Sequence, residues 1–422
     1  MNFEHGEIRD TPTAAQQHYI ATDATTRGHS LPHERFGIRK LFEFLGKPEI
    51  VLKLWDGFSV GEDAGDSIGT VTFRNRSVFY KMLFFGEVAF GDGYSVGSIK
   101  IDGNLVDMLL EFVTSRRKLG HIKSPFAWTP STWLPASSYS GHERENIHHH
   151  YDVGNSFYRL WLDEEMQYTC AYFPDPNMSL EAAQQAKMDH VCRKLQLQPG
   201  DRVAEAGCGW GSLARHMAKY YGAKVTAYNI SHEQISFASN RARSEGYADQ
   251  VQYVEDDYRN ICGEFDVFVS VGMLEHVGPK NYRALGKVVD ATLSSDGRAL
   301  IHSIGRNIAR PMSPWIEKRI FPGAYPPTLR EMMDILEPNY FSVLDIENLR
   351  LHYARTLEHW LQRFENSSAD VVDLFDEQFV HAWRLYLSGS IAAFLAGGLQ
   401  LFQIVFTRDT NNIIPWSREH LY

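Results

Sequence analysis

Three glycines stand within five positions of one another, a spacing that suits a turn beneath a nucleotide or nucleoside. Gly207, Gly209 and Gly211 follow a short run from Arg202 that has the composition of a buried strand, and a helical pattern opens after them over 212–220. Glycine permits a tight turn and lets a ligand approach the bare backbone. A helix that begins there points its free N–H groups at whatever lies above the turn. Strand, turn and helix together predict a nucleotide or nucleoside site at the edge of an α/β sheet.

The details of this turn favour one nucleoside. Dinucleotide-binding proteins usually show G-x-G-x-x-G and an acidic residue near the end of the following strand. Here the pattern is G-x-G-x-G, the following strand (223–228) leads into Asn229 without a carboxylate, and Glu205 precedes the glycines. This arrangement resembles class I methyltransferases, which bind S-adenosylmethionine (SAM). A glycine-rich turn can also be a plain tight connection, so the elements after it carry the argument.

Strands and helices alternate after the turn, which predicts an α/β fold with a mostly parallel sheet. We expect strands at 225–228, 251–254, 265–271 and 298–304, and helices at 231–245 and 282–293. Ligands of such sheets bind at the carboxyl ends of the strands. The polar residues that this register places at that edge are Asn229, Asp256, Asp257, Glu275 and His302.

Composition limits the classes of function. The chain has 422 residues, enough for two or three domains, and a formal net charge of −10, which disfavours nonspecific nucleic-acid binding. Its four cysteines have no zinc-like spacing and fit a reducing cytoplasm better than a disulfide scaffold. The first residues lack the basic start and apolar run of a signal peptide. The most apolar window, 391–406, is too short and too interrupted to span a bilayer. We therefore expect a cytoplasmic protein.

The chain divides into four expected regions. They are a flexible tail (1–28), a small α+β domain (29–120), a linker (121–147) and a catalytic domain (148–422). Within the small domain we expect strands at 50–55, 69–73 and 98–102, a helix at 77–83, a glycine turn at 90–94 and a helix at 105–118 capped by Asn104.

The helix at 105–118 has two features open to more than one interpretation. Its apolar face, which includes Leu109 and Phe112, most often means a core, and a lipid-binding groove is the less favoured alternative. The basic run from Arg116 to Lys123 suits a solvated helix end, and contact with an anionic membrane is again less favoured.

The consecutive histidines 148–150 do not face one way in a helix or strand, and no acidic or cysteine cluster accompanies them. We predict no metal site.

Several segments resemble those of cyclopropane-fatty-acid synthases (cyclopropane-fatty-acyl-phospholipid synthases) and the related mycolic-acid methyltransferases. They cover residues 148 to about 364 densely, and the N-terminal region resembles the lipid-binding domain of the longer synthases more loosely. The matching segments include His149–Gly154, Tyr168–Phe173, Ala206–Gly211, Ser270–Tyr282, Ile301–Gly305, Trp315–Gly323 and His352–Tyr353. The resemblance implies a class I SAM-dependent methyltransferase with a Rossmann-like catalytic domain. Such enzymes transfer a methyl group to a cis double bond of an acyl chain, usually in membrane phospholipid, with bound bicarbonate as the general base.

The resemblance also implies site residues. For bicarbonate they are Cys170, Glu275, His302 and Tyr353, with a backbone contribution near Ile304. For SAM they are Tyr168, Thr169, Gly207, Gly209, Asn229, Gln234, Asp256 and Asp257. Taken singly, most have a blander explanation: Cys170 as a small buried hydrophobe, His302 as a core histidine, and the two aspartates as a solvated turn. Glu275 is harder to explain structurally, since a buried acid is costly unless it is paired or used.

Some positions depart from the family pattern and keep alternatives open. The usual Asp-Ile before the glycines is Glu205-Ala206, and an arginine expected near the C-terminal helix is Leu395. The segment from Leu349 to Ala354 also resembles methyltransferases that give methyl- or methylene-branched products. A catalytically inactive lipid-binding protein is the alternative of another class. We expect peripheral attachment to the inner face of the membrane; a homodimer stays open.

Overall fold

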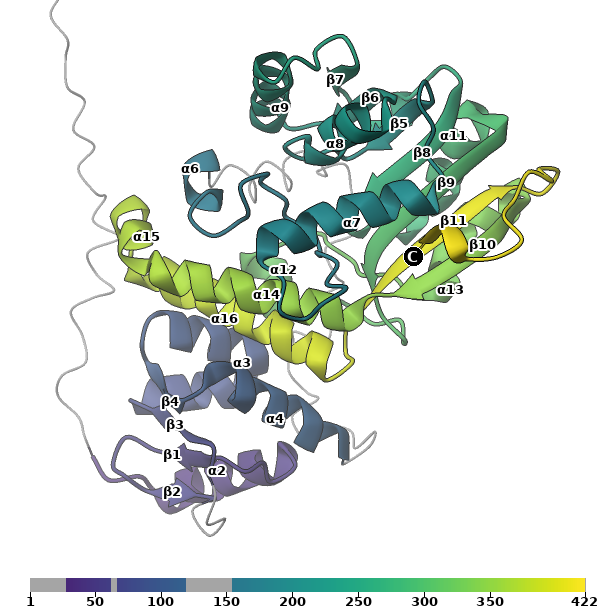
Figure 1. Ribbon diagram of the computed structural model, residues 1–422. Coiled ribbons are helices and arrows are strands. Elements are labelled where there is room, and N and C mark those ends of the chain that lie inside the picture. The colour runs from purple at the N-terminus through teal and green to yellow at the C-terminus, as the bar shows by residue number, and fades with distance from the viewer. Residues whose placement is uncertain (1–27, 62–66, 119–153, 422) are drawn as a thin grey trace, which may run out of the picture.

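The computed structural model describes residues 28–61, 67–118 and 154–421 (Figure 1). The expected linker at 121–147 and the histidine run at 148–150 fall outside these ranges, as does the expected tail apart from residue 28. The chain forms an N-terminal unit (28–118) and a catalytic unit (154–421), each with its own sheet. No helix of the described ranges is long and apolar enough to cross a membrane.

The N-terminal unit is a four-stranded sheet of order β2-β1-β3-β4 with three helices. β1 and β3 are parallel, and the outer pairs are antiparallel. Ile38, Phe79 and Met108, one from each helix, are buried together with the sheet in one core. The elements are α2 (Pro32–Phe44), β1 (Val51–Lys53), β2 (Ser59–Val60), β3 (Gly69–Phe73), α3 (Arg76–Ser95), β4 (Ile99–Gly103) and α4 (Leu105–Lys118). The cap expected at α4 is confirmed, because Asn104 Oδ1 accepts from the N–H groups of Val106 at 2.9 Å and Asp107 at 3.2 Å.

The glycine turn expected at 90–94 is wrong, because these residues lie inside α3. Gly91 serves close packing: a Cβ there would meet the Trp315 indole at 2.4 Å. Gly93 is similarly tight, since its Cβ would lie 2.9 Å from side chains of Val78 and Ile99. The chain instead breaks its helical path at Gly86, with φ 52° and ψ −122°, a region open almost only to glycine.

The catalytic unit contains a seven-stranded sheet of order β10-β11-β9-β8-β5-β6-β7. The strands β7, β6, β5, β8 and β9 are parallel to one another. At the edge beyond β9, β11 pairs antiparallel with β9, and β10 pairs antiparallel with β11. The expected α/β alternation is therefore confirmed. The strands are β5 (Arg202–Ala206), β6 (Lys224–Asn229), β7 (Val251–Glu255), β8 (Phe265–Val271), β9 (Leu293–Gly305), β10 (Phe341–Asn348) and β11 (Gln400–Arg408).

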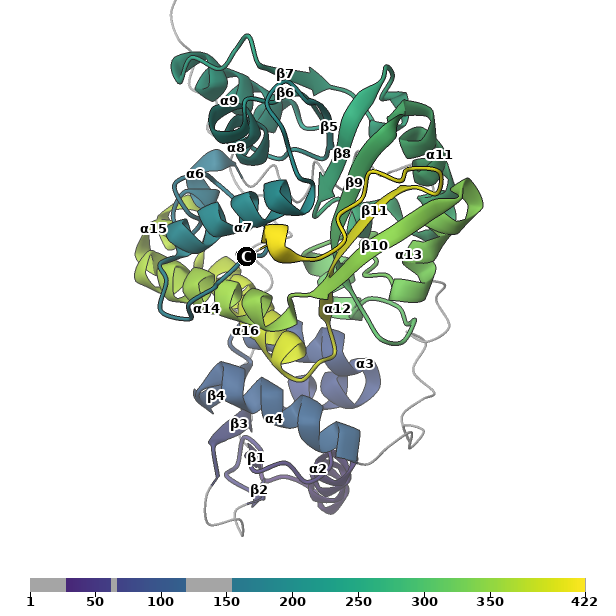
Figure 2. The same ribbon diagram turned by 45° about the vertical axis from the view of Figure 1, so that its right-hand side comes forward.

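Helices cover this sheet and connect it to the N-terminal unit. α14 and α16 lie between the large sheet and the N-terminal unit in both views (Figures 1 and 2), and α16 contacts both α3 and α4. The α-helices are α6 (Asn155–Tyr158), α7 (Leu180–Lys194), α8 (Ser212–Tyr221), α9 (His232–Ser244), α10 (Leu274–Val277), α11 (Tyr282–Thr292), α12 (Pro314–Arg319), α13 (Leu329–Leu336), α14 (Arg350–Asn366), α15 (Ser368–Leu374) and α16 (Glu377–Leu395). Short 3₁₀ helices are η2 (Tyr258–Asn260), η3 (Pro279–Asn281), η4 (Glu337–Asn339) and η5 (Glu419–Leu421).

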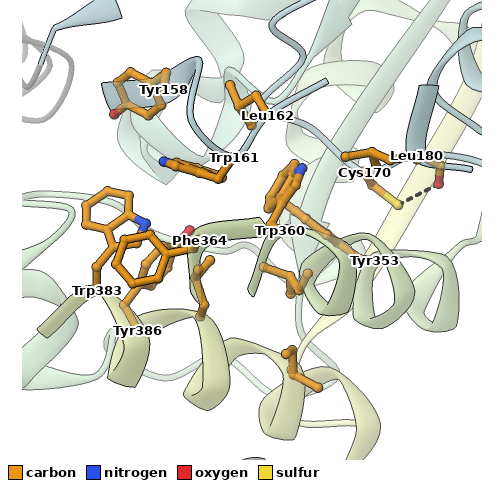
Figure 3. Packing of buried hydrophobic residues seen from close by; sticks show 14 of the residues in the cluster. Tyr158, Trp161, Leu162, Cys170, Leu180, Tyr353, Trp360, Phe364, Trp383 and Tyr386 are labelled. Atoms are coloured by element: carbon orange, nitrogen blue, oxygen red, sulfur yellow. Dashed lines mark hydrogen bonds between the residues drawn. The ribbon is translucent and has the colours of Figure 1, made fainter. Parts of the chain in front are cut away.

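An aromatic cluster joins the segment before α7 to the two long helices. Trp161 packs edge-on against Trp360 of α14, with ring centroids 5.6 Å apart, and in a tilted arrangement against Trp383 of α16 at 5.8 Å (Figure 3). Such pairs add geometric preference to a large buried apolar area. The cluster therefore fixes the segment 155–173, which carries Tyr168, Thr169 and Cys170, against the helices that face it.

Candidate active site

A cavity of about 920 Å³ runs between the two units. Its walls are mainly apolar and come from both: Phe44, Phe73 and Phe112 of the N-terminal unit, and Phe321, Phe394 and Leu399 of the catalytic unit. The apolar face of α4 is divided, since Met108 is buried in the core while Leu109, Phe112 and Val113 line the cavity. A space of this size and character suits a long hydrocarbon chain.

The polar end of the cavity holds Glu275, which lies in the short helix α10 just after β8. Its Oε1 accepts a hydrogen bond from the backbone N–H of Ile304 at 2.6 Å. Its Oε2 is buried and has no hydrogen-bond partner within the described ranges. Burial raises the pKa of this carboxyl to about 7, against the smaller opposing effect of hydrogen bonds from backbone N–H groups. One carboxyl oxygen is thus anchored and the other is available to a ligand.

His302 on β9 stands at the same end of the cavity. The Gln403 side-chain Nε2 donates to its Nδ1 at 3.0 Å, across the β9–β11 pair. Burial, aided by the nearby cationic Lys187, lowers the pKa of the imidazole to about 3. His302 is therefore neutral at physiological pH, with Nδ1 as acceptor and the proton on Nε2. That Nε2–H is buried and unpartnered among the residues the structure describes, so it can donate to an anion.

Cys170 and Tyr353 line the cavity with Glu275, His302 and Ile304. Cys170 is buried, its thiol donates to the Ala171 carbonyl oxygen at 3.1 Å, and burial raises its pKa. Tyr353 packs on Phe394, with ring centroids 4.7 Å apart. The structure thus brings the five residues expected around an ion to one cavity. The backbone at Ile304 was expected to contact the ion, but its N–H donates to Glu275 instead.

The glycine turn forms the second half of the site. Gly207, Gly209 and Gly211 all have positive φ. A Cβ at Gly209 would meet nothing within 4 Å, so the turn faces open space there. Asn229 Nδ2 donates to Gln234 Oε1 at 2.7 Å and to the Gly209 carbonyl oxygen at 3.4 Å, which groups three of the residues expected to bind SAM.

The two halves meet at the end of β8. A Cβ at Gly207 would press on Met273 at 2.8 Å, and one at Gly272 would meet the Thr169 methyl group at 2.8 Å. Tyr168 and Thr169 line the cavity themselves, and the hydroxyl oxygens of Tyr168 and Tyr386 are 2.8 Å apart. A ligand over the glycine turn would therefore lie next to the polar end of the cavity.

The two aspartates expected near SAM differ in their surroundings. The Asp256 N–H donates to the Asn229 carbonyl oxygen at 3.0 Å, which places Asp256 beside the turn. Asp257 caps η2 by accepting from the Arg259 N–H at 2.9 Å and forms an ion pair with the Arg259 guanidinium at 2.7 Å. Its carboxylate has a local structural task, so Asp256 is the better placed of the two.

Three buried residues around the site were not among the expected ones. Gln403 orients His302 as described above. Lys187 Nζ of α7 donates to Thr169 Oγ1 at 3.0 Å, and burial lowers its pKa to about 8. Burial raises the pKa of Glu205 to about 7, opposed by the charges of Lys187 and Arg215. Only Glu205 left a signal in the sequence, as the acid before the glycines.

The fold and this site define a class I SAM-dependent methyltransferase. The glycine cradle at the carboxyl edge of a mostly parallel sheet suits the nucleoside and methionine parts of SAM. The mainly apolar cavity beside it has the size and lining for a second, hydrophobic substrate. SAM would be held by the turn at Gly207 and Gly209, by Asn229 and Gln234, and by the Tyr168–Thr169 segment.

Comparisons with known proteins identify the family. A family model described as mycolic acid cyclopropane synthetase matches residues 139–404, and the chain belongs to this family. It is 42% identical over 264 residues to the cyclopropane-fatty-acyl-phospholipid synthase of Escherichia coli K12, covering 62% of this chain and 68% of that one. It is 34% identical over 385 residues to a Pseudomonas putida protein named "Probable fatty acid methyltransferase", covering 88% and 95%.

Solved structures agree with this assignment. The cyclopropane synthase MmaA2 of Mycobacterium tuberculosis superimposes with a TM-score of 0.61 at 27% identity, covering 64% of this chain and all of that one. The mycolic acid cyclopropane synthase CmaA1, in complex with SAH and CTAB, gives a TM-score of 0.60 at 28% identity, covering 63% of this chain and 98% of that one. Both likenesses cover less than two thirds of this chain.

Proposed function

We propose that the protein transfers a methylene group from SAM to the cis double bond of an unsaturated fatty acyl chain in membrane phospholipid, giving a cyclopropane. One observation carries the proposal. Two unpartnered buried groups of the described chain, Glu275 Oε2 and His302 Nε2–H, stand at the polar end of a long apolar cavity beside the glycine turn. An alkene needs such a cavity, and an ion that removes a proton there needs such a pair.

The cavity walls supply positioning and exclude water. SAM supplies an electrophilic methyl group on a sulfonium. An alkene is a weak nucleophile, so the apolar walls must hold it in line with that methyl group. Methyl transfer leaves a positive charge on the chain. The rings of Tyr168 and Tyr353, which line the cavity, offer π faces to a cation in a site with little water.

Ring closure requires that one proton leaves the added methyl carbon while its electron pair forms the second carbon–carbon bond. Bicarbonate held at the polar end would supply the base. His302 Nε2–H would donate to one of its oxygens, and Glu275 Oε2 would accept the hydrogen bond of its hydroxyl. The Ile304 N–H holds Glu275 in place. A base formed by a small ion can stand close to a cation where a side chain would itself be alkylated.

The product decides between this proposal and its nearest alternative. A hydride shift that moves the positive charge to the methylated carbon, followed by loss of a proton from the added methyl group, gives a methylene branch. A separate reductant that adds hydride and a proton to that product gives a methyl branch. The experiment incubates the full-length protein with SAM and vesicles of a cis-monounsaturated phospholipid. Ring-methylene protons in the NMR spectrum of the product support the proposal, and olefinic methylene protons contradict ring closure.

A second measurement addresses bicarbonate. Turnover in buffer purged of carbon dioxide should fall and should recover on addition of bicarbonate. An unchanged rate would remove bicarbonate from the mechanism without affecting the assignment of SAM. A protein that binds lipid vesicles but yields no methylated lipid under any condition would support the inactive lipid-binding alternative.

We also propose that the protein attaches to the membrane peripherally, from the cytoplasmic side. The support is the cavity itself, because a phospholipid acyl chain must leave a bilayer to enter it. The N-terminal unit contributes much of the cavity wall, so we expect this unit to govern binding to vesicles.

A further inference from the structure

Exposed apolar side chains of both units adjoin residues that line the cavity, and we call this group of side chains the rim. Phe84 and Phe85 of α3 are 61% and 54% exposed, and Ile308 in the loop after β9 is 68% exposed. Phe85 lines the cavity, and Ile308 lies between Arg306 and Arg310, which also line it. Single exposed apolar residues are common on proteins, but exposed apolar residues from two units beside one cavity need an explanation.

A break in α3 places its two exposed phenylalanines at the surface. Gly86 breaks α3 directly after Phe85, so the helix ahead of the break ends with its two phenylalanines at the surface. Glu87, directly after the break, accepts a hydrogen bond from the Ser313 hydroxyl in the loop of the catalytic unit. This hydrogen bond joins the kink to the loop that carries Ile308.

The second half of α3 is anchored on the catalytic unit, which keeps the rim in place. Asp92 accepts from the Trp315 indole N–H at 3.2 Å and forms an ion pair with Arg319 at 2.7 Å. Gly91 lies against the same indole. The break at Gly86 therefore separates an anchored segment from the exposed turn that precedes it.

Arginine guanidinium groups line the same cavity. Arg116 and Arg117 at the end of α4 and Arg310 all line the cavity. Arg116 lies over the Phe44 ring at 4.6 Å, Arg117 donates to the Ala396 carbonyl oxygen, and Arg310 donates to the Gly398 carbonyl oxygen at 3.4 Å. Ala396 is the C-cap of α16, so the Arg117 contact compensates a carbonyl at the end of that helix, and Arg117 and Arg310 each have further N–H groups. In a chain with a net charge of −10, this is a local basic surface.

We infer that this rim is where the protein docks on a phospholipid bilayer, with Phe84, Phe85 and Ile308 among the acyl chains and Arg116, Arg117 and Arg310 at the depth of the phosphates. The inference rests on the proposed function and adds to it the surface and the route, because an acyl chain passes directly from the bilayer into the cavity. Aromatic and aliphatic side chains flanked by arginine fit the two layers of a membrane interface. A second protein surface would not require the opening of a lipid-sized cavity at its centre.

The test uses two residues that flank the opening and do not line the cavity. Phe84→Ser combined with Ile308→Ser should reduce sedimentation of the full-length protein with vesicles containing acidic phospholipid by about tenfold or more. Turnover of a short-chain unsaturated phospholipid, supplied as monomers, should stay near that of wild type, while turnover of vesicle lipid falls in parallel with binding. The matched control is Ile413→Ser with Trp416→Ser, two residues that are 73% and 104% exposed on the C-terminal segment. The control should bind vesicles like wild type.

Depth is measured with Phe84→Trp. Lipids brominated along the acyl chain should quench the fluorescence of the introduced tryptophan more than headgroup-labelled lipids do, relative to wild type. Equal vesicle binding by the double variant and its control would overturn the inference, as would Phe84→Trp fluorescence that brominated lipids leave unchanged. So would a dimer that the double variant converts to monomers without a change in vesicle binding. Failure of the proposed function differs, since it would abolish turnover of monomeric substrate by the wild-type protein.

Discussion

Replacing Glu275 by glutamine should lower turnover and, above neutral pH, stabilise the folded protein. The glutamine Oε1 can keep the bond that Glu275 Oε1 accepts from the Ile304 N–H at 2.6 Å. The other oxygen becomes an NH₂ group, which cannot accept the hydrogen bond of an ion. Loss of one such contact in a site without water costs about 2–4 kcal/mol in the transition state, which corresponds to a fall in kcat of about 30- to 1,000-fold. The affinity for SAM should not change.

The stability effect follows from the pKa of the carboxyl. Burial raises the pKa of Glu275 from 4.5 to about 7. The folded state then holds this proton more tightly than the unfolded state, so the stabilising contribution is complete below pH 4.5 and is lost as pH rises to about 7. The shift amounts to about 3 kcal/mol. Wild type should lose about that much free energy of unfolding across this window relative to Glu275→Gln.

The assay is denaturant unfolding of both proteins at pH 5 and pH 8, together with product formation and SAM titration at pH 8. Glu377→Gln, at an exposed position in the first turn of α16, is the control and should change neither quantity. Undiminished turnover by Glu275→Gln would remove this carboxyl from the chemistry. A variant that lost stability relative to wild type on going from pH 5 to pH 8 would show that the carboxyl is not held in a costly, desolvated position.

Four further substitutions test the two halves of the site. Gln403→Glu should move the His302 proton to Nδ1, which ¹⁵N NMR detects, and reduce turnover by about tenfold with SAM affinity retained. Gly211→Ala should lower stability by about 2 kcal/mol, measured as a lower Tm, because its Cβ would lie 2.4 Å from the Tyr253 hydroxyl. Gly209→Ala should lose SAM affinity with a smaller change in Tm, since its Cβ enters only open space. Lys187→Met should weaken SAM binding through Thr169. Because burial lowers the pKa of Lys187 to about 8 from 10.5, wild type should gain stability relative to this variant as pH rises through that window.

The sequence could predict the large sheet because its signals are local. The glycine turn, the alternation of strand and helix and the cap at Asn104 each depend on neighbours in the chain. The turn expected at 90–94 failed for the opposite reason. Gly91 is small because the Trp315 indole, far away in sequence, packs against it. A glycine selected for close packing and one selected for a turn are indistinguishable until the partner is known.

The residues of the candidate site also differ in how far the sequence could predict them. Residues that follow strands, such as Glu275 and Asn229, could be placed at the ligand edge from the register alone. Gln403 could not, because its role depends on the antiparallel pairing that sets it opposite His302. In the sequence it only interrupts an apolar window. The N-terminal contribution to the cavity was likewise hidden, since the apolar face of α4 serves the core and the cavity at once.

The geometry of the polar end follows from one strand. β9 carries His302, and two residues later it supplies the N–H that anchors Glu275. A displacement of β9 would therefore move both groups together and leave their spacing unchanged. Each unpartnered buried polar atom costs about 1–3 kcal/mol, and apolar residues at both positions would make a more stable protein. β9 is paired with parallel β8 on one side and with antiparallel β11, the strand that carries Gln403, on the other. This pairing prevents β9 from shifting to give the unpartnered groups a hydrogen bond. A pair of buried groups that cannot relax toward each other is preorganised for a third group between them.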